Sequence, residues 1–273
     1  MKENILLFDI GGTKTRVATS DGSQILGDPI IFETPQDFQI GIETIKSAKE
    51  RLIGTNSIQR AFGSVSGPFD EGHAKLVNSP NLPLWVNKPL KKALEEALEA
   101  PVRLENDASL AGLGEANFGA GRGHHIVAYL TVSTGIGGAR IVDGQLDKST
   151  FGFEPGYQII NFQDEATFAV DILSGKSLEK KFHKKAREIE DNSLWNELAE
   201  KLAYVVNNTI VFWSPDVVVL GGSMILGEPA IDVEETEKGL EKVMKIFPKY
   251  SKIKKAELGD LSGLYGALTL SKE

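Results

Sequence analysis

The chain has 273 residues and carries 30 Lys and Arg against 38 Asp and Glu, so its formal net charge is −8. This acidic balance argues against nucleic acid or an anionic membrane as the main partner. A hydrophobic content of 41% supports a substantial core at this length and excludes intrinsic disorder. The absence of cysteine excludes disulfides, thiolate nucleophiles and cysteine-ligated zinc. Because no apolar run is long enough for a signal peptide or a membrane span, we expect a cytoplasmic protein.

The first predicted element is a strand that ends in a glycine turn. The apolar run Ile5 to Phe8 leads into Asp9-Ile10-Gly11-Gly12-Thr13, and an extended pattern resumes at Thr15. The pattern predicts strand, glycine turn, strand. Lys14 and Arg16 alternate on the second strand, where pairing with surface acids explains them.

A helix is predicted next from Pro35 to Leu52, because a proline after Thr34 suits a helix start. Further on, a short strand from Val102 ends in Glu105-Asn106-Asp107, just where a second helix, from 107 to 118, is predicted to begin. Asp107 is either a helix N-cap or a carboxylate that accepts a proton from a substrate hydroxyl, and both roles can hold together.

The strand and glycine turn occur a second time. Ile126 to Val132 runs into Ser133-Thr134-Gly135-Ile136-Gly137-Gly138, and an extended pattern follows. We interpret this repetition as two related α/β halves, each offering one glycine hairpin to a shared ligand.

The remaining elements complete a mixed α/β pattern. Ser193 is predicted to cap the longest helix, which Pro215 stops. A third apolar run, Val217 to Leu220, ends at Gly221-Gly222, and a small-residue helix is predicted from Leu261 to Leu270. Strands and helices mixed in this way indicate α/β layers.

Glycine turns after strands suit phosphate binding, because backbone N–H groups can approach an anion where no Cβ intervenes. Thr13 and Thr134 add hydroxyl donors, and Asp9 at its strand end is placed to face Mg²⁺ through water. One such turn alone is as typical of a tight hairpin as of a phosphate site. The dinucleotide fingerprint is disfavoured, because Gly11-Gly12 leads into a strand where that motif needs a helix.

Together these residues resemble the ROK family of sugar kinases, repressors and related proteins, within the actin-like ATPase superfamily. The resemblance spans nearly the whole chain. Its motifs are Asp9-Ile10-Gly11-Gly12-Thr13-Lys14, Gly63-Ser64-Val65-Ser66-Gly67-Pro68, Asn81-Leu82-Pro83-Leu84-Trp85, Glu105-Asn106-Asp107-Ala108, Gly114-Glu115-Ala116, Leu130 to Gly138, and Pro215 to Gly222.

The resemblance implies two actin-like (ribonuclease-H-like) α/β lobes with a central cleft. We expect residues 1–108 plus 258–273 in the N-terminal lobe and 109–257 in the C-terminal lobe. It implies an ATP-dependent kinase, with Mg²⁺, that phosphorylates glucose or a close analogue at the 6-hydroxyl with Asp107 as general base, and it favours a homodimer. The implied sugar contacts are Asn106, Glu154, Tyr157, Ser66, Gly67 and Asn81. The implied ATP contacts are Asp9, Gly11, Gly12, Thr13, Lys14, Thr134, Gly135, Gly137, Gly221 and Gly222.

The sequence departs from the family at the sugar side. Family kinases commonly have Gly-Glu-Ile-Gly-His followed by a cysteine-rich zinc loop, whereas this chain reads Phe153-Glu154-Pro155-Gly156-Tyr157 and has no cysteine. No zinc is therefore expected. Tyr157 can offer a hydroxyl or a ring face to a sugar, or can serve packing alone.

Other functions stay open on sequence alone. They are an N-acetylhexosamine or N-acetylmannosamine kinase, a non-catalytic sugar sensor descended from a kinase, and a chaperone-like ATPase. A DNA-binding repressor is disfavoured because the first strand begins near residue 4. The histidines, His73 and His183 among them, are interpreted as isolated or surface residues.

Overall fold

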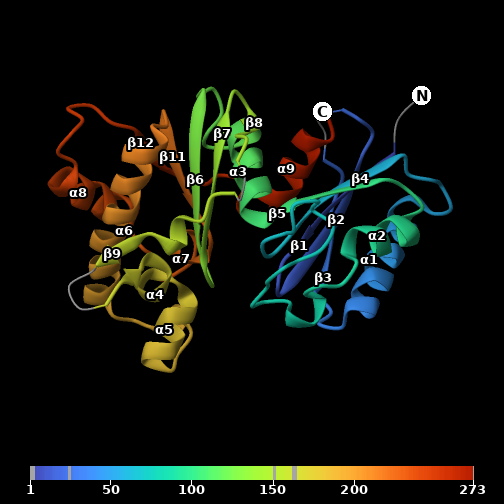
Figure 1. Ribbon diagram of the computed structural model, residues 1–273, viewed down its shortest axis with the longest axis horizontal. Helices are drawn as coiled ribbons and strands as arrows, with labels where there is room; N and C mark the ends of the chain where they lie inside the picture. The colour runs from blue at the N-terminus through green and yellow to red at the C-terminus, as the bar shows by residue number, and fades with distance from the viewer. Residues whose placement is uncertain (1–3, 24–25, 150–151, 162–164, 273) are drawn as a thin grey trace. The chain divides into compact units, whose positions relative to one another are not determined.

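The computed structural model describes residues 4–23, 26–149, 152–161 and 165–272 (Figure 1). The chain forms two compact units: unit 1 comprises Met1–Gly114 and Asp260–Glu273, and unit 2 comprises Glu115–Gly259. The lobe boundaries expected from the sequence, after residues 108 and 257, lie a few residues before the two points where the chain crosses between these units. The expected boundaries stay a prediction. Among the described residues, no helix has the length and apolar character needed to cross a membrane.

Unit 1 is built on a five-stranded sheet of order β3-β2-β1-β4-β5. β1 pairs antiparallel with β2 and parallel with β4, and β4 pairs parallel with β5. The predicted strand, glycine turn, strand is confirmed. The strands are β1 (Ile5–Ile10), β2 (Lys14–Ser20), β3 (Ile30–Glu33), β4 (Arg60–Val65) and β5 (Val102–Asn106). The helices are α1 (Phe38–Ile53), η1 (Pro83–Trp85), α2 (Leu90–Leu98), the start of α3 (Asp107–Phe118), η4 (Gly259–Leu261) and α9 (Ser262–Leu270).

The alternation along β1 gives this sheet two different faces. Leu6, Phe8 and Ile10 belong to the apolar cluster that also contains the buried residues of α1 and α2. Asp9 points to the other face, where a Cβ on Gly263 of α9 would lie 2.9 Å from its carboxylate carbon. Figure 1 shows α1 and α2 together beside the sheet, with α9 apart from them. Asp9, near the end of β1, therefore lies against the first turn of α9.

The helix α1 begins later than predicted, and the start at Pro35 was wrong. It begins at Phe38, because the Asp37 carboxylate accepts the backbone N–H of Ile40 at 3.0 Å and caps the helix. The carbonyl of Pro35 accepts the indole N–H of Trp85 at 3.2 Å. The segment before α1 is thus used to hold a fully buried tryptophan rather than to extend the helix.

Unit 2 contains a second five-stranded sheet, of order β12-β11-β6-β7-β8, and the small pair β10-β9. β6 pairs antiparallel with β7 and parallel with β11. Its strands are β6 (Ile126–Val132), β7 (Ile136–Val142), β8 (Gln145–Leu146), β9 (Ile159–Asn161), β10 (Thr167–Phe168), β11 (Val217–Gly221) and β12 (Lys252–Lys255). Its helices, besides the end of α3, are η2 (Pro155–Tyr157), α4 (Ala169–Leu173), α5 (Gly175–Phe182), η3 (Ala186–Glu188), α6 (Asn192–Trp213), α7 (Ser223–Leu226) and α8 (Val233–Val243).

The long helix α6 is confirmed, but its predicted cap is wrong. The Asp191 carboxylate, not Ser193, accepts the N–H groups of Ser193 and Leu194, at 3.0 and 3.2 Å. Leu194, Leu198 and Leu202 lie on the buried side of the helix and belong to the core of unit 2.

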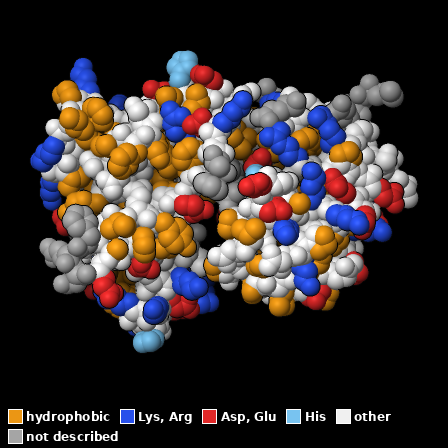
Figure 2. Space-filling view, in the orientation of Figure 1, with side chains coloured by type: hydrophobic (Ala, Val, Ile, Leu, Met, Phe, Trp, Pro, Cys, Tyr) orange, Lys and Arg blue, Asp and Glu red, His pale blue; other side chains and the backbone are white. Residues whose placement is uncertain are grey.

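On the face that Figure 2 shows, acidic and basic side chains are interspersed among uncharged ones.

The two large sheets have the same plan. In each, successive strands pair antiparallel on one side of a central strand, β1 or β6, and parallel on the other side. In each, the chain passes from the central strand through a glycine turn into the next strand. The prediction of two related α/β halves is confirmed.

Candidate active site

The candidate site of unit 1 lies where three parallel strands end. Asp9 is near the end of β1, Ser66 follows β4, and Asn106 and Asp107 form the junction of β5 with α3. Ligands of open α/β sheets bind at the carboxyl ends of the strands. The structure therefore brings together four residues that the sequence placed in one site.

Asp107 is the first residue of α3 and is partly buried. Burial and the negative charge of Asp9 raise the pKa of its carboxyl group to about 6, and a hydrogen bond with Ser66 opposes this shift. Its own carboxylate accepts the N–H of Ala108 at 2.9 Å. Asp107 is thus the first residue of the helix rather than its N-cap, and its role as a proton acceptor stays a prediction.

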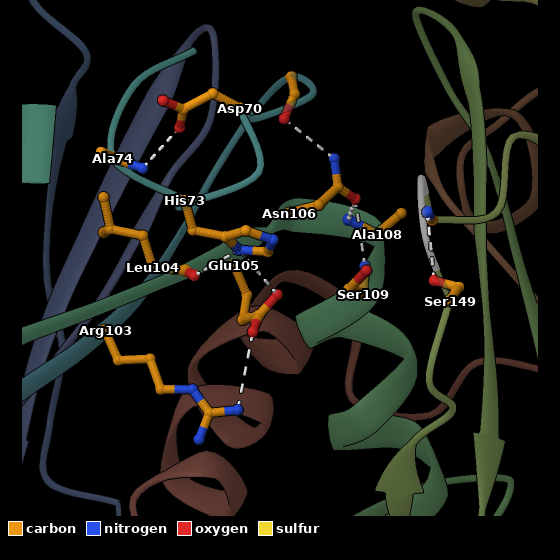
Figure 3. Close-up of polar contacts among 12 residues, drawn as sticks. Asp70, His73, Ala74, Arg103, Leu104, Glu105, Asn106, Ala108, Ser109 and Ser149 are labelled. Atoms are coloured by element: carbon orange, nitrogen blue, oxygen red, sulfur yellow. Dashed lines mark hydrogen bonds and ion pairs between the residues drawn. The ribbon is translucent and has the colours of Figure 1, made fainter. Parts of the chain in front are cut away.

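Asn106 performs most of the capping at this helix start. Its side-chain oxygen accepts the N–H groups of Ala108 and Ser109, at 2.9 and 3.3 Å, as Figure 3 shows. Its side-chain nitrogen donates to the carbonyl of Gly67 at 3.2 Å. Asn106 therefore joins the start of α3 to the loop after β4.

Asp9 is held by two side chains. The hydroxyl of Ser64 donates to its Oδ1 at 2.5 Å, and the Nη1 of Arg16 lies 3.2 Å from its Oδ2. Burial raises the pKa of Asp9, whereas the contacts with Ser64 and Arg16 lower it. Arg16 also binds Asp260 at 2.8 Å, and its buried Nε has no hydrogen-bond partner among the described residues. The predicted pairing of Arg16 with a surface acid is seen with Asp260, but Arg16 itself is buried and also pairs with Asp9, whose side chain is 15% exposed.

The first glycine turn keeps donors available. The carbonyls of Gly11 and Gly12 accept hydrogen bonds from Thr34 and Gln36, at 2.7 and 3.2 Å. Among the described residues, the N–H groups of Gly12 and Thr13 have no hydrogen-bond partner. Donors left open at a strand end are what an anion needs.

The loop between β4 and η1 approaches this turn closely. A Cβ on Gly12 would lie 2.4 Å from the Cβ of Asn81, so only glycine fits at position 12 without displacing Asn81. Asn81 donates to the hydroxyl of Ser66 at 3.4 Å, and Ser79 donates to the Ser66 carbonyl at 2.7 Å. The residues expected at the sugar and at the phosphates are therefore neighbours in unit 1.

Unit 2 brings together the second glycine turn and the Gly221-Gly222 segment. Gly222 has a φ of +86°, and a Cβ there would lie 2.4 Å from the carbonyl oxygen of Val132, at the end of β6. Gly137 lies within β7, where it pairs with Thr131, rather than in the turn itself. The predicted phosphate and adenosine segments of this unit thus meet at one edge of its sheet.

The start of α5 also meets the second turn, which sequence analysis missed. The N–H of Gly175 donates to the Ser133 carbonyl at 2.7 Å, and the N–H of Lys176 donates to the Thr134 carbonyl at 3.3 Å. No local signal in the sequence connects these segments.

Glu154 precedes the 3-10 turn η2 of unit 2 and Tyr157 is its last residue, and the Tyr157 N–H donates to the Glu154 carbonyl at 3.1 Å. The Tyr157 side chain is 61% exposed. Its ring meets that of Phe168 edge-on, with centroids 5.9 Å apart. Tyr157 is therefore not a core residue, which disfavours packing as its only role.

Two α/β units of one plan, each with a glycine turn after its central strand, define an actin-like ATPase fold. The chain belongs to the ROK family, whose family model matches residues 6–273. An uncharacterized protein of Clostridium perfringens is 31% identical over 98% of this chain and 97% of its own length. The bifunctional enzyme NanE/NanK of Brucella melitensis is 30% identical over 98% of this chain, which spans 54% of that enzyme.

Two further relatives carry single-enzyme names. The glucokinase of Thermotoga maritima is 26% identical over 100% of this chain and 98% of its own. The crystal structure of the ROK hexokinase from Thermus thermophilus matches with a TM-score of 0.83 and 27% identity, over 97% of each chain. At the level of class, these comparisons support a sugar kinase of the ROK family, without giving the sugar.

Proposed function

We propose that this chain transfers the γ-phosphate of ATP to the 6-hydroxyl of a hexose, glucose or a close analogue. The observation that supports the proposal is Asp107, a carboxyl group with a pKa of about 6 at the junction of β5 and α3, close enough to Asp9 to be affected by its charge. A general base works best when its pKa lies near the working pH.

In the proposed reaction, Asp107 accepts the proton of the sugar hydroxyl as its oxygen forms a bond to the γ-phosphorus. The bond from that phosphorus to the bridging oxygen breaks, and ADP leaves. Phosphoryl transfer depends mainly on positioning and charge neutralisation, so few residues need to react.

The residues present fit a magnesium ion that arrives with the nucleotide. Among the described residues, no group of three or more His, Asp or Glu side chains could hold a metal alone. Mg²⁺ usually keeps several waters and binds through one or two carboxylates plus substrate phosphates, and Asp9 can supply one carboxylate through water. When bound, the ion neutralises phosphate charge.

For ATP, we propose that the open N–H groups of Gly12 and Thr13 bind phosphate oxygens in unit 1, with Gly11 shaping the turn and Lys14 adding charge. In unit 2, we propose Thr134, Gly135 and Gly137 for the phosphates and Gly221 and Gly222 for the adenosine. The donors left open in the first turn support this assignment.

For the sugar, we propose contacts from Asn106, Ser66, Gly67 and Asn81 of unit 1 and from Glu154 and Tyr157 of unit 2. The hydrogen bonds that join Asn106 to Gly67 and Asn81 to Ser66 support the first group, because they fix these residues to one another. The exposed ring of Tyr157 supports its inclusion.

A second candidate is an N-acetylmannosamine kinase. The bifunctional NanE/NanK relative, which aligns over 98% of this chain, favours it. A sugar sensor without turnover and a chaperone-like ATPase are weaker candidates, because Asp9 and the Asn106-Asp107 pair are both present. Action in the cytoplasm and assembly as a homodimer stay predictions from the sequence.

The test is ADP release by the full chain with ATP, Mg²⁺ and a panel of hexoses that includes glucose, mannose, N-acetylglucosamine and N-acetylmannosamine. We expect turnover that requires a sugar and is highest with glucose. Asp107→Asn should lower kcat by roughly 10²–10⁴-fold while sugar binding persists in calorimetry. Asp143→Asn, at an exposed turn of unit 2, is the matched control. Equal ADP release with and without every sugar would contradict the proposal.

A further inference from the structure

The long loop between β4 and η1 carries Ser66, Gly67 and Asn81, three of the residues proposed to contact the sugar, yet little of it is regular structure. Within it, Phe69 and Leu76 form an isolated antiparallel bridge, so residues 69–76 make a small hairpin. The Asp70 carboxylate closes the hairpin by accepting the N–H groups of Ala74 and Lys75, at 2.8 and 3.1 Å. The hairpin is thus well defined in itself.

His73 at the tip of this hairpin is not isolated, and the interpretation from sequence was wrong. Its Nδ1 lies 3.1 Å from the carbonyl oxygen of Leu104 and 3.4 Å from Oε2 of Glu105, as Figure 3 shows. A carbonyl can only accept, so Nδ1 carries the hydrogen and donates to β5. The His73 ring also stacks on Phe69, with centroids 5.4 Å apart and planes within 7°.

These contacts come directly before the proposed catalytic residues. Leu104 and Glu105 are followed in the chain by Asn106, which donates to Gly67 at the base of the same loop. The loop is therefore fastened to the end of β5 at two points, at its base through Asn106 and at the hairpin tip through His73. A second contact restrains rotation of the loop about the Asn106 contact.

The backbone at His73 is left-handed. His73 has a φ of +49°, in a region where residues other than glycine are uncommon and where asparagine, aspartate and histidine are the most enriched. A backbone hydrogen bond accompanies this conformation: the N–H of His73 donates to the Asp70 carbonyl at 2.9 Å. The left-handed turn directs the ring back onto Phe69 and towards β5.

We propose that His73 is a positioning residue for the sugar. By donating to Leu104 it holds the loop that carries Ser66, Gly67 and Asn81 at a fixed distance from Asp107. This inference rests on the proposed function for the identity of the ligand, but the anchoring itself concerns only unit 1. Because His73 acts on the sugar loop, the sugar KM and Kd depend on it and the KM for ATP does not.

Three variants separate the donor from the ring. His73→Phe keeps an aromatic ring against Phe69 and removes the donor, whereas His73→Asn offers an N–H near the position of Nδ1 and tolerates the left-handed backbone. His183→Phe is the matched control, because His183 is also left-handed, at φ +55°, but is exposed at the end of α5. The control therefore reproduces the backbone strain without the contact to β5.

We expect His73→Phe to raise the sugar KM and the calorimetric sugar Kd about fivefold, the effect of one hydrogen bond, with the KM for ATP within about twofold of the parent. His73→Asn should recover most of the loss, and His183→Phe should change neither constant. An unchanged sugar Kd in His73→Phe, or an equal rise in the KM for ATP, would overturn the inference.

Hydrogen exchange tests the anchoring without any sugar. In His73→Phe, amides of residues 66–79 should exchange faster than in the parent, while those of β1 and β4 stay protected. His183→Phe should leave this loop unchanged. If the loop exchanges normally in His73→Phe, the anchoring is refuted, whereas a parent enzyme that phosphorylates no hexose refutes the proposed function alone.

Discussion

Asp9 and Arg16 stand opposite each other on β1 and β2, and the guanidinium of Arg16 lies 3.2 Å from the carboxylate of Asp9. The pair is largely buried, with side-chain exposures of 11% for Arg16 and 15% for Asp9. A second carboxylate, Asp260, binds the other end of the guanidinium but is 77% exposed. Arg16 thus joins the largely buried Asp9 to Asp260 in η4, the short turn before α9.

The first prediction concerns Arg16. Arg16→Met should lower the free energy of unfolding by about 1–3 kcal/mol, because a partly buried carboxylate loses its cation. The KM for Mg²⁺-ATP should rise about tenfold. Arg16→Lys should recover part of both effects, since lysine restores the positive charge but not the planar guanidinium, which can bind two carboxylates at once. Urea unfolding and initial rates measure these changes. Asp260→Asn removes only the exposed partner, so an equal effect from that variant would contradict the assignment.

The second prediction is an acidic limb in the pH–rate profile. Because burial and the charge of Asp9 raise the pKa of Asp107 to about 6, the base is lost as the pH falls through that value. We expect kcat/KM for the sugar to rise to a plateau above pH 7. In Ser66→Ala the limb should move to higher pH, since the hydrogen bond with Ser66 lowers the pKa of Asp107. A limb that stays in place would argue against the contact with Ser66.

The third prediction is that the ionised Asp107 side chain lowers the stability of the folded state at neutral pH. Its pKa is higher in the folded state than the ordinary 3.8, so the folded chain binds more protons between about pH 4 and 6 and loses stability as the pH rises through that range. Asp107→Asn should therefore raise the Tm by a few degrees at pH 7 and have little effect at pH 4. Calorimetric scans at both values test this. An equal shift at the two pH values would show that packing, not charge, is responsible.

The fourth prediction concerns Glu115, which is fully buried in unit 2. Its carboxylate accepts the N–H groups of Ala120, Glu257 and Leu258, at 3.0, 3.1 and 2.8 Å. Glu115→Ala should lower the free energy of unfolding by about 3 kcal/mol or more, because it leaves buried donors without an acceptor. Glu115→Gln should cost less, since one oxygen remains. Urea unfolding is the measurement, and Glu257→Ala, which keeps its backbone N–H, should change it by less than about 0.5 kcal/mol.

The fifth prediction is that the ring of Tyr157, not its hydroxyl, contributes to sugar binding. The ring is exposed and supported by Phe168, which suits stacking against a sugar face. Tyr157→Ala should raise the sugar KM about tenfold, and Tyr157→Phe should stay within about twofold. Tyr204→Ala, an exposed tyrosine on α6, is the control. A large loss in Tyr157→Phe would assign the role to the hydroxyl instead.

Local patterns predicted most of the fold. The apolar runs before Asp9 and Ser133 lie in the central strands of the two sheets, and the repeated glycine turn correctly indicated two α/β halves. The helix starts were less certain, because Asp37 and Asp191 are as good caps as the residues that the sequence favoured. Propensity alone cannot choose between neighbouring caps when tertiary contacts, such as that of Trp85 with Pro35, fix the entering chain.

The polar partners of the candidate site could not be predicted. Arg16 and Asp260, or His73 and Leu104, are far apart in the chain, and nothing near either residue in the sequence indicates its partner. Strand order brings such pairs together, and strand order is a property of the whole sheet. Asp107 could be proposed from the sequence because its residue type, its place after a strand and its neighbour Asn106 are all local.

The hydrogen bonds that the Asn106 side-chain amide already makes restrict how a substrate hydroxyl can bind to it. Its oxygen already accepts two backbone N–H groups, and one of its two N–H bonds is directed to Gly67, so one donor remains without a partner among the described residues. A hydroxyl oriented by this amide must therefore receive a hydrogen bond through a lone pair. The hydrogen of that hydroxyl is then free to point to the adjacent carboxylate of Asp107. The hydrogen bonds that Asn106 already makes therefore determine the direction in which the proton leaves.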